Sequence, residues 1–240
     1  MISLVQSGFY GQKRRKTMAK KDILDEILAE KPVLSQIKEE DVILEPLLEE
    51  IGLIEDENIS SFVRSILVRS TDFWLMPSSF SGKYHPKDEH GEGGNVLHTK
   101  RVMRVAQILA ESYGLTDEEK DMVFAAVLLH DIKKGNRYGD DTKFTYDPMH
   151  PYTVGQFVKK CQDEDRKFAS ESQSSTLYLA EDIVQSILRL VRCHLGPWSP
   201  VPETSPVTYL DMIVHIADNV ASKVDYVVDG KDIKEDRWNV

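Results

Sequence analysis

The sequence is poor in cysteine, in positive charge and in long apolar runs, and each shortage excludes a class of protein. Two cysteines in 240 residues, Cys161 and Cys193, are too few for the disulfide framework of a small secreted protein. Acidic residues outnumber Lys and Arg by 40 to 30, giving a formal net charge of -10, so strong binding to duplex nucleic acid is not expected. No apolar run is long enough to cross a bilayer. We therefore expect a cytoplasmic protein without a membrane segment.

The chain is long enough for one domain with a small appendage. Residues 1–20 contain a basic segment and are predicted to form a flexible tail, with contact to nucleic acid as the alternative role of these charges. Residues 21–70 show helical spacing of apolar residues and are predicted to form N-terminal packing helices. Residues 71–240 are predicted to form the main domain.

Local signals predict several helix boundaries in this domain. Gly114 is expected to end a helix over residues 95–113, and residues 116–119 read as a capping box that begins the next helix. A loop is expected after Lys133, then a short helix from Tyr152 to Lys160 and a polar connection over residues 161–177. The last long helix is expected to begin near Ser205, because Pro206 suits the first helical position.

The most informative segment is an apolar stretch, residues 121–129, that ends in the adjacent pair His130 and Asp131. Val127 and Val123 lie three and seven positions before His130, so helical periodicity places the imidazole on the buried face. A buried, ionised carboxylate needs an ion pair, hydrogen bonds or a metal. The pair therefore predicts either satisfied core residues or part of a metal site.

Three further residues favour the metal: His98, His194 and Asp218. Each has apolar residues at helical spacing on its side of a predicted helix. Four predicted helices thus direct metal-ligating side chains toward their packed faces, which is how helical bundles build metal sites. We therefore predict a metal centre rather than unrelated core histidines.

The ordered set His98, His130-Asp131 and Asp218 resembles the HD-domain superfamily of metal-dependent phosphohydrolases. The segment from Leu128 to Gly135 is similar to the sequence that this family has around its central pair. The resemblance covers roughly residues 90–228. It implies an all-α fold, an HD-domain helical bundle, to which this chain adds extra N-terminal helices.

Two more segments, around His150 and His194, resemble the additional histidine segments of two-metal members, particularly HD-domain exoribonucleases that work from the three-prime end. The resemblance implies two sets of ligands that share Asp131, namely His98, His130 and Asp218 for one ion, and His150 and His194 for a second. Mixed imidazole and carboxylate ligands suit Mn, Fe, Co, Ni or Zn better than Mg or Ca. One or two divalent transition metal ions are the expected cofactors.

Basic residues near the predicted ligands are candidates for substrate binding. Lys134 matches the family lysine three positions after the central Asp and suits a phosphate; neutralising a helix C-terminus is its alternative role. Arg137 is a weaker second candidate. Lys223 matches a basic position commonly near substrate in the exoribonuclease-like members. Asp211 and His215 are expected to orient ligands from behind.

Residues 71–94 are rich in Gly, Ser and charge and are predicted to form a long loop. Long loops in compact domains are often functional, so an entrance or lid is one interpretation and a solvated connector is the other. His85 and His90, within this loop, are expected at the surface.

These features predict hydrolysis of a phosphoester by a metal-activated hydroxide, with Asp131 and Lys134 as catalytic residues. The related exoribonucleases add an oligonucleotide-binding β-barrel, whereas residues 1–70 here look helical. A nucleotide or a short oligonucleotide is therefore the favoured substrate. A cyclic-nucleotide phosphodiesterase is the second interpretation. The third is a non-catalytic, metal-containing HD module that binds a nucleotide or a protein partner. Assembly into an oligomer is left open.

Overall fold

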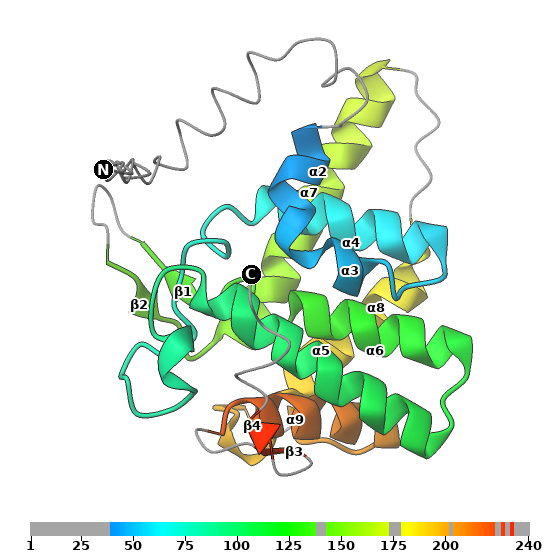
Figure 1. Cartoon of the computed structure of the whole chain (residues 1–240). Helices are drawn as coiled ribbons and strands as arrows, with labels where there is room; N and C mark the ends of the chain where they lie inside the picture. Colours follow the sequence, from blue (N-terminus) through cyan, green and yellow to red (C-terminus); the bar gives the residue numbers. More distant parts are fainter. Residues whose placement is uncertain are drawn as a thin grey trace, which may run out of the picture. The chain divides into compact units, whose positions relative to one another are not determined.

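The computed structural model describes residues 39–137, 143–172, 179–201, 204–223, 227–228 and 231–232, most of them helical (Figure 1). The α-helices are α2 (Glu39–Leu44), α3 (Leu48–Ile51), α4 (Glu57–Arg69), α5 (Gly94–Tyr113), α6 (Asp117–Leu129), α7 (His150–Ser172), α8 (Glu181–Cys193) and α9 (Tyr209–Ala221). The short elements are η2 (Glu45–Leu47), η3 (Lys87–Glu89), η4 (Gly196–Trp198), β1 (Gly135–Asn136), β2 (Thr145–Tyr146), β3 (Val227–Val228) and β4 (Lys231–Asp232). The predicted all-α fold with extra N-terminal helices is confirmed. The tail predicted at 1–20 and residues 21–38 of the predicted packing helices lie outside the described residues.

Helix α6 is the centre of the bundle and contacts α3, α4, α5, α8 and α9. Figure 1 shows it between α4 and α5. Every residue from Val123 to Leu129 is buried, so this part of the helix is surrounded by packing on all sides. The residues that follow α6, beginning with His130, therefore emerge inside the bundle.

The connection between α5 and α6 follows from local sequence. Gly114 has φ of 66°, the left-handed conformation that glycine adopts without penalty, and it ends α5. Thr116 and Glu119 form the predicted capping box at the start of α6. The turn is short, so α5 and α6 are sequential neighbours in the bundle, as expected.

The N-terminal helix α4 shares its core with the later helices. Its buried residues include Val63 and Leu67, which belong to the same apolar cluster as the α6 core. Asp121 of α6 adds a polar link, because its two carboxylate oxygens accept hydrogen bonds from the backbone N–H groups of Glu55 and Asp56, each at 2.8 Å. Within residues 43–223, the described N-terminal helices are thus joined to the bundle by packing and by hydrogen bonds.

Three boundaries differ from the sequence prediction. Helix α7 was expected to end at Lys160, but it continues to Ser172, because its polar residues form solvated helical turns rather than a connection. Helix α9 begins at Tyr209, after the expected start near Ser205, because Thr208 and Asp211 form a capping box. The two-residue strands of the β1–β2 pair lie where a loop was expected. Among the described residues, no helix has both the length and the apolar character to cross a membrane.

The long loop before α5 is irregular apart from η3, as predicted. Gly94, the first residue of α5, lies so close to η3 that a Cβ atom there would be 2.0 Å from the carbonyl oxygen of Glu89. Only glycine permits this approach without a shift of the backbone. The close packing brings Glu89 to the first turns of α5, beside His98.

Candidate metal centre

The six residues predicted as ligands all lie together, in two groups of three. One group is His98, His130 and Asp218, and the other is Asp131, His150 and His194; within each group the candidate ligand atoms lie within 4.8 Å of one another. These residues come from α5, the end of α6, the start of α7, the end of α8 and α9. Positions far apart in the sequence therefore form one buried cluster.

Asp131 lies between the two groups and directs one carboxylate oxygen to each. Its Oδ2 atom is 3.3 Å from Nε2 of His130 and 3.8 Å from Nε2 of His98. Its Oδ1 atom is 3.1 Å from Nε2 of His150 and 3.7 Å from Nε2 of His194. A carboxylate in this position can contact two ions at once.

Backbone carbonyls fix the orientation of three of the imidazoles. The Nδ1 atoms of His130, His150 and His194 lie 2.7, 2.8 and 2.6 Å from the carbonyl oxygens of Val127, Asp147 and Val191. A carbonyl oxygen only accepts, so each Nδ1 carries the proton and donates it. With Nε2 unprotonated, each ring would present the lone pair of this atom to the cluster, the arrangement typical of metal-binding histidine.

The two aspartates are held in their ionised form. Burial would raise the pKa of Asp131, but the charges of His130 and Lys134 lower it well below its ordinary value. Burial acts on Asp218 in the same direction, and the hydrogen bond with His98 lowers its pKa far below the ordinary range. The cluster thus contains two carboxylates that stay charged, which favours the binding of a cation.

The histidines differ in their response to this environment. Burial would lower the pKa of His98, but its contacts with Asp218 and Glu89 raise it to about 9. For His194, burial and the charge of His150 lower the pKa to about 3. His194 is therefore neutral over the physiological pH range. His98 instead carries a positive charge between the carboxylates of Asp218 and Glu89, and a metal ion can replace this charge.

The donor atoms fit divalent cations. The Nε2 atom of His130 and the Oδ1 atom of Asp131 are buried and have no hydrogen-bond partner. The Nε2 atoms of His150 and His194 are 3.1 Å apart, and a metal ion or a proton between them would satisfy both lone pairs. Unsatisfied buried polar atoms of this kind are uncommon in folded proteins. The two groups could therefore hold metal ions.

The expectation that His85 lies at the surface is wrong. Its side chain is buried, its Nδ1 atom is 3.0 Å from Oε2 of Glu89, and its ring packs edge-on against that of His98 with centroids 4.5 Å apart. The cause is a backbone contact that folds this part of the loop inward, since the N–H of His85 donates to the carbonyl of Ser222 at 3.1 Å. His90 is half-buried, and its Nε2 atom contacts the carbonyl of Tyr84.

Glu89 supports His98 from behind. It is fully buried, with Oε2 at 3.4 Å from Nδ1 of His98 and Oε1 paired with Arg101. His85, Glu89 and His98 could also ligate a metal by geometry. The guanidinium of Arg101 already neutralises Glu89, so we assign this group to holding His98 with its Nε2 atom directed at the cluster. The sequence prediction missed Glu89.

Comparison with known proteins agrees with this geometry. The family model of the HD domain matches residues 96–223, which is more than half of the chain. The chain belongs to the HD domain family. One relative of this HD-domain protein, 29% identical over 144 residues, is the dihydroneopterin 2',3'-cyclic phosphate phosphodiesterase of Methanocaldococcus jannaschii. The match covers 57% of the HD-domain chain and 49% of that protein, so it spans about half of the relative's length. No solved structure gives a significant match.

The three predicted substrate-binding cations of the HD-domain protein lie in different settings. The ammonium of Lys134 is buried and 2.6 Å from Oδ2 of Asp131. Arg137 is more exposed, pairs with Asp72 and lies over the ring of Phe144. Lys223 is exposed and follows the end of α9. Of these three cations, only Lys134 has a direct contact with a candidate metal ligand among the described residues.

The two residues expected to orient ligands, His215 and Asp211, make different contacts. Nδ1 of His215 is 2.8 Å from the backbone carbonyl of His194, and a Cβ atom on Gly196 would lie 2.3 Å from its ring, so it packs against the end of α8. Asp211 instead caps its own helix and pairs with Arg189 at 2.7 Å. His215 therefore contacts the backbone of a ligand candidate, whereas the contacts of Asp211 are with Arg189 and with the start of its own helix.

Two more residues near the cluster were not identified from the sequence. Asn95 donates from Nδ2 to the backbone carbonyl of Asp131 at 3.1 Å and so fixes the turn that carries this ligand. Tyr146 of β2 packs against His150 with ring centroids 5.7 Å apart, and it is 43% exposed. Phe80 also packs against Tyr146. The contacts Asn95–Asp131 and Phe80–Tyr146 join positions far apart in the sequence, so no local pattern predicts them.

Proposed function

We propose that this chain is a metal-dependent phosphohydrolase that acts on a phosphoester of a nucleotide or a short oligonucleotide. The observation that carries the proposal is the placement of Asp131, with one oxygen directed to each of two ligand groups. The family and the relative's phosphodiesterase activity support the same reaction class.

In this proposal His98, His130 and Asp218 would hold one ion and His150 and His194 a second, with Asp131 as the ligand available to both. When bound, such ions polarise the phosphoryl oxygens and lower the pKa of a water molecule to make a nucleophile. The mixed nitrogen and oxygen ligands favour Mn, Fe, Co, Ni or Zn as the physiological metal. A mononuclear site with the first ligand group alone is the simpler variant.

Lys134 offsets the charge of the substrate in the proposed reaction. Its ammonium is buried beside Asp131, and burial would lower its pKa, but the charge of Asp131 raises it, so it stays cationic. A fixed cation at this position can pair with a phosphoryl oxygen without reorganising. Arg137 and Lys223 are proposed as outer contacts to the substrate.

A cyclic phosphodiester is the second candidate substrate. The relative in Methanocaldococcus jannaschii is a 2',3'-cyclic phosphate phosphodiesterase according to its name, and it matches this chain over 144 residues. Tyr146 and Phe80 offer aromatic faces beside His150, which suit a flat ring system in the substrate.

A substrate panel tests the proposal. Purified protein, analysed for bound metal, is assayed with nucleoside mono-, di- and triphosphates, with 2',3'- and 3',5'-cyclic nucleotides and with short oligonucleotides. We expect metal-dependent hydrolysis of at least one class, abolished by chelation and restored by Mn²⁺. Metal-loaded protein that hydrolyses none of them would instead support the non-catalytic module that binds a nucleotide or a protein partner.

A further inference from the structure

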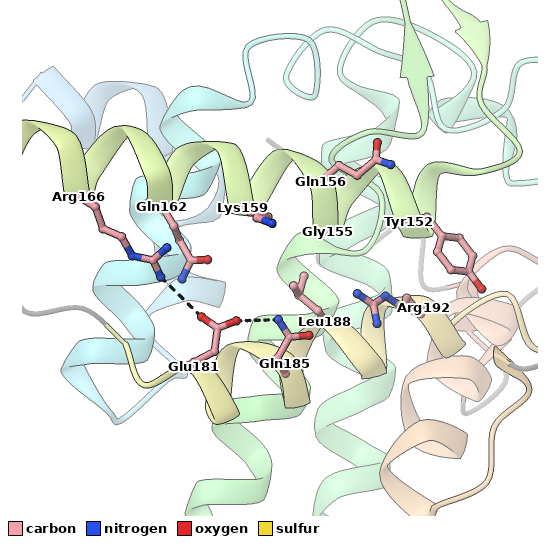
Figure 2. Close-up of a pocket in the computed structure, with 10 residues that line it drawn as sticks. All are labelled: Tyr152, Gly155, Gln156, Lys159, Gln162, Arg166, Glu181, Gln185, Leu188 and Arg192. Atoms are coloured by element: carbon pink, nitrogen blue, oxygen red, sulfur yellow. Dashed lines mark hydrogen bonds and ion pairs between the residues drawn. The ribbon is translucent and has the colours of Figure 1, made fainter.

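A groove of about 340 Å³ lies between α7 and α8, on residues that the proposed reaction does not use. Figure 2 shows Lys159 and Arg166 reaching it from α7, and Glu181, Gln185 and Arg192 from α8. Its volume is within the range of small-molecule sites, which begins at roughly 300 Å³. We call this site the α7–α8 groove.

The groove carries an excess of positive charge although the whole chain is acidic. Arg166 is neutralised by Glu181 at 3.6 Å, and Glu181 also accepts a hydrogen bond from Gln185 at 2.8 Å. Lys159 and Arg192 form no ion pair with any residue that the structure describes. Two cations therefore face the groove without an acidic partner, one from each helix.

Buried polar atoms in the groove also lack partners. Nε of Arg192 and the hydroxyl of Tyr152 are buried and form no hydrogen bond. A Cβ atom on Gly155 would lie 3.5 Å from Nη2 of Arg192, so the guanidinium reaches across to the backbone of α7. Buried donors without acceptors are costly, and an acceptor-rich ligand removes that cost.

We propose that the α7–α8 groove binds a small molecule that carries a phosphate group, held by Lys159 and Arg192. A phosphate monoester has a charge of about -1.5 to -2 at neutral pH, which matches the two unpaired cations. Arginine and lysine are the usual phosphate-binding side chains. The amide side chain of Gln185 and the hydroxyl of Tyr152 add neutral hydrogen-bonding groups for the rest of the ligand.

The site is separate from the metal centre but shares its supporting helices. Tyr152 lies two positions after His150 on α7, and Arg192 two positions before His194 on α8. A bound phosphate compound therefore bridges the two helices that carry the second ligand group.

Calorimetric titration of the full chain tests this proposal, with pyrophosphate, ATP and adenosine as probes. The protein is treated with chelator first, so that no turnover occurs. We expect wild-type protein to bind pyrophosphate or ATP at one site per chain, and adenosine much more weakly. Tighter binding of ATP than of pyrophosphate would identify a nucleotide as the ligand class, and equal binding would identify the phosphate groups alone.

Variants locate the binding. Lys159→Gln and Arg192→Gln should each weaken it by about tenfold or more, because each removes a charge-assisted contact. The matched control is Lys160→Gln, since Lys160 is the neighbouring residue of α7 and lies 3.8 Å from Glu164, outside the groove. Lys159 is exposed, so its variant should fold normally, which a thermal melt verifies for both groove variants.

The proposal is overturned by any of three results. In the first, neither pyrophosphate nor ATP binds at millimolar concentration. In the second, both bind equally well to wild-type protein and to both groove variants. In the third, Lys134→Met abolishes the binding while the groove variants keep it. The last result would place the anion at the metal centre. None of the three results contradicts the proposed hydrolysis, whose own test is the metal-dependent assay.

Discussion

We expect Glu89 to influence the candidate metal centre although it is not one of the six predicted ligands. It is buried, it contacts the Nδ1 side of His98, and its charge is shared with Arg101 and His85. Carboxylates behind a metal-binding imidazole fix its orientation and increase its basicity, and their loss typically costs about 10- to 100-fold in metal affinity.

Glu89→Gln should therefore weaken Mn²⁺ binding by about 10- to 100-fold while leaving the fold intact. Titration calorimetry with Mn²⁺ measures the change, and circular dichroism checks the fold. Glu92→Gln, an exposed change in the same loop, is the control and should bind Mn²⁺ like wild-type protein. Equal affinity in the Glu89 and Glu92 variants would show that Glu89 only stabilises the loop.

Lys134 is predicted to act on the substrate rather than on the metal. Lys134→Met should lower kcat/KM for a hydrolysed phosphoester by about 100-fold, the usual order for removing one fixed donor of transition-state charge. Metal content, measured by mass spectrometry, should stay at the wild-type level. A parallel loss of metal and activity would mean that Lys134 works by holding Asp131, which it contacts.

At the scale of single residues, the sequence predicted the side chains that cluster in the candidate metal centre, but not the residues that support them. His98, His130, His194 and Asp218 were found because each interrupts an apolar helical face, which is a local pattern. Glu89 was missed because it reaches His98 through an irregular loop and a close backbone contact at Gly94. The error at His85 has the same cause, because a composition rich in Gly, Ser and charge predicts a solvent-exposed loop.

The helix boundaries show which parts of the fold can be predicted from a few neighbouring residues. The end of α5 and the start of α6 were predicted because Gly114 and the Thr116–Glu119 box act within a few residues. Helix α7 was predicted too short because its later turns are polar, and without an apolar stripe a solvated helix resembles a connection. The β1–β2 pair has two-residue strands, which are too short to show any periodicity.

The third prediction concerns the contact between α6 and the residues before α4. Asp121 joins α6 to the residues before α4 by two hydrogen bonds to backbone N–H groups. Asp121→Asn should lower the free energy of unfolding by about 1.5–3 kcal/mol, because hydrogen bonds to a buried charged group are lost. Urea denaturation measures this, with the exposed Asp117→Asn as control. Equal stability of the two variants would show that this link contributes little.

For the whole molecule, an ion bound at the candidate site would connect helices from most of the described chain. The candidate ligands extend from position 98 to position 218, and only the folded chain brings them together. A ligand that binds only the native state stabilises it by about 2.7 kcal/mol at 100 times its dissociation constant.

Adding Mn²⁺ at that concentration to chelator-treated protein should therefore raise the free energy of unfolding by about 2–3 kcal/mol. Chemical denaturation with and without the ion measures the shift. Ca²⁺ at the same concentration should have a smaller effect, because it prefers oxygen ligands. A stability that is independent of Mn²⁺ would mean that the six residues do not form a metal site in solution.

The most direct test of the central claim is the metal content of Asp131→Ala after reconstitution with Mn²⁺ and desalting, compared with wild-type protein and His194→Ala. If Asp131 contacts both ions, wild-type protein should retain about two ions per chain, His194→Ala about one, and Asp131→Ala almost none, with hydrolysis abolished in the last. Asp131→Ala protein that keeps the wild-type metal content and full activity would contradict the account.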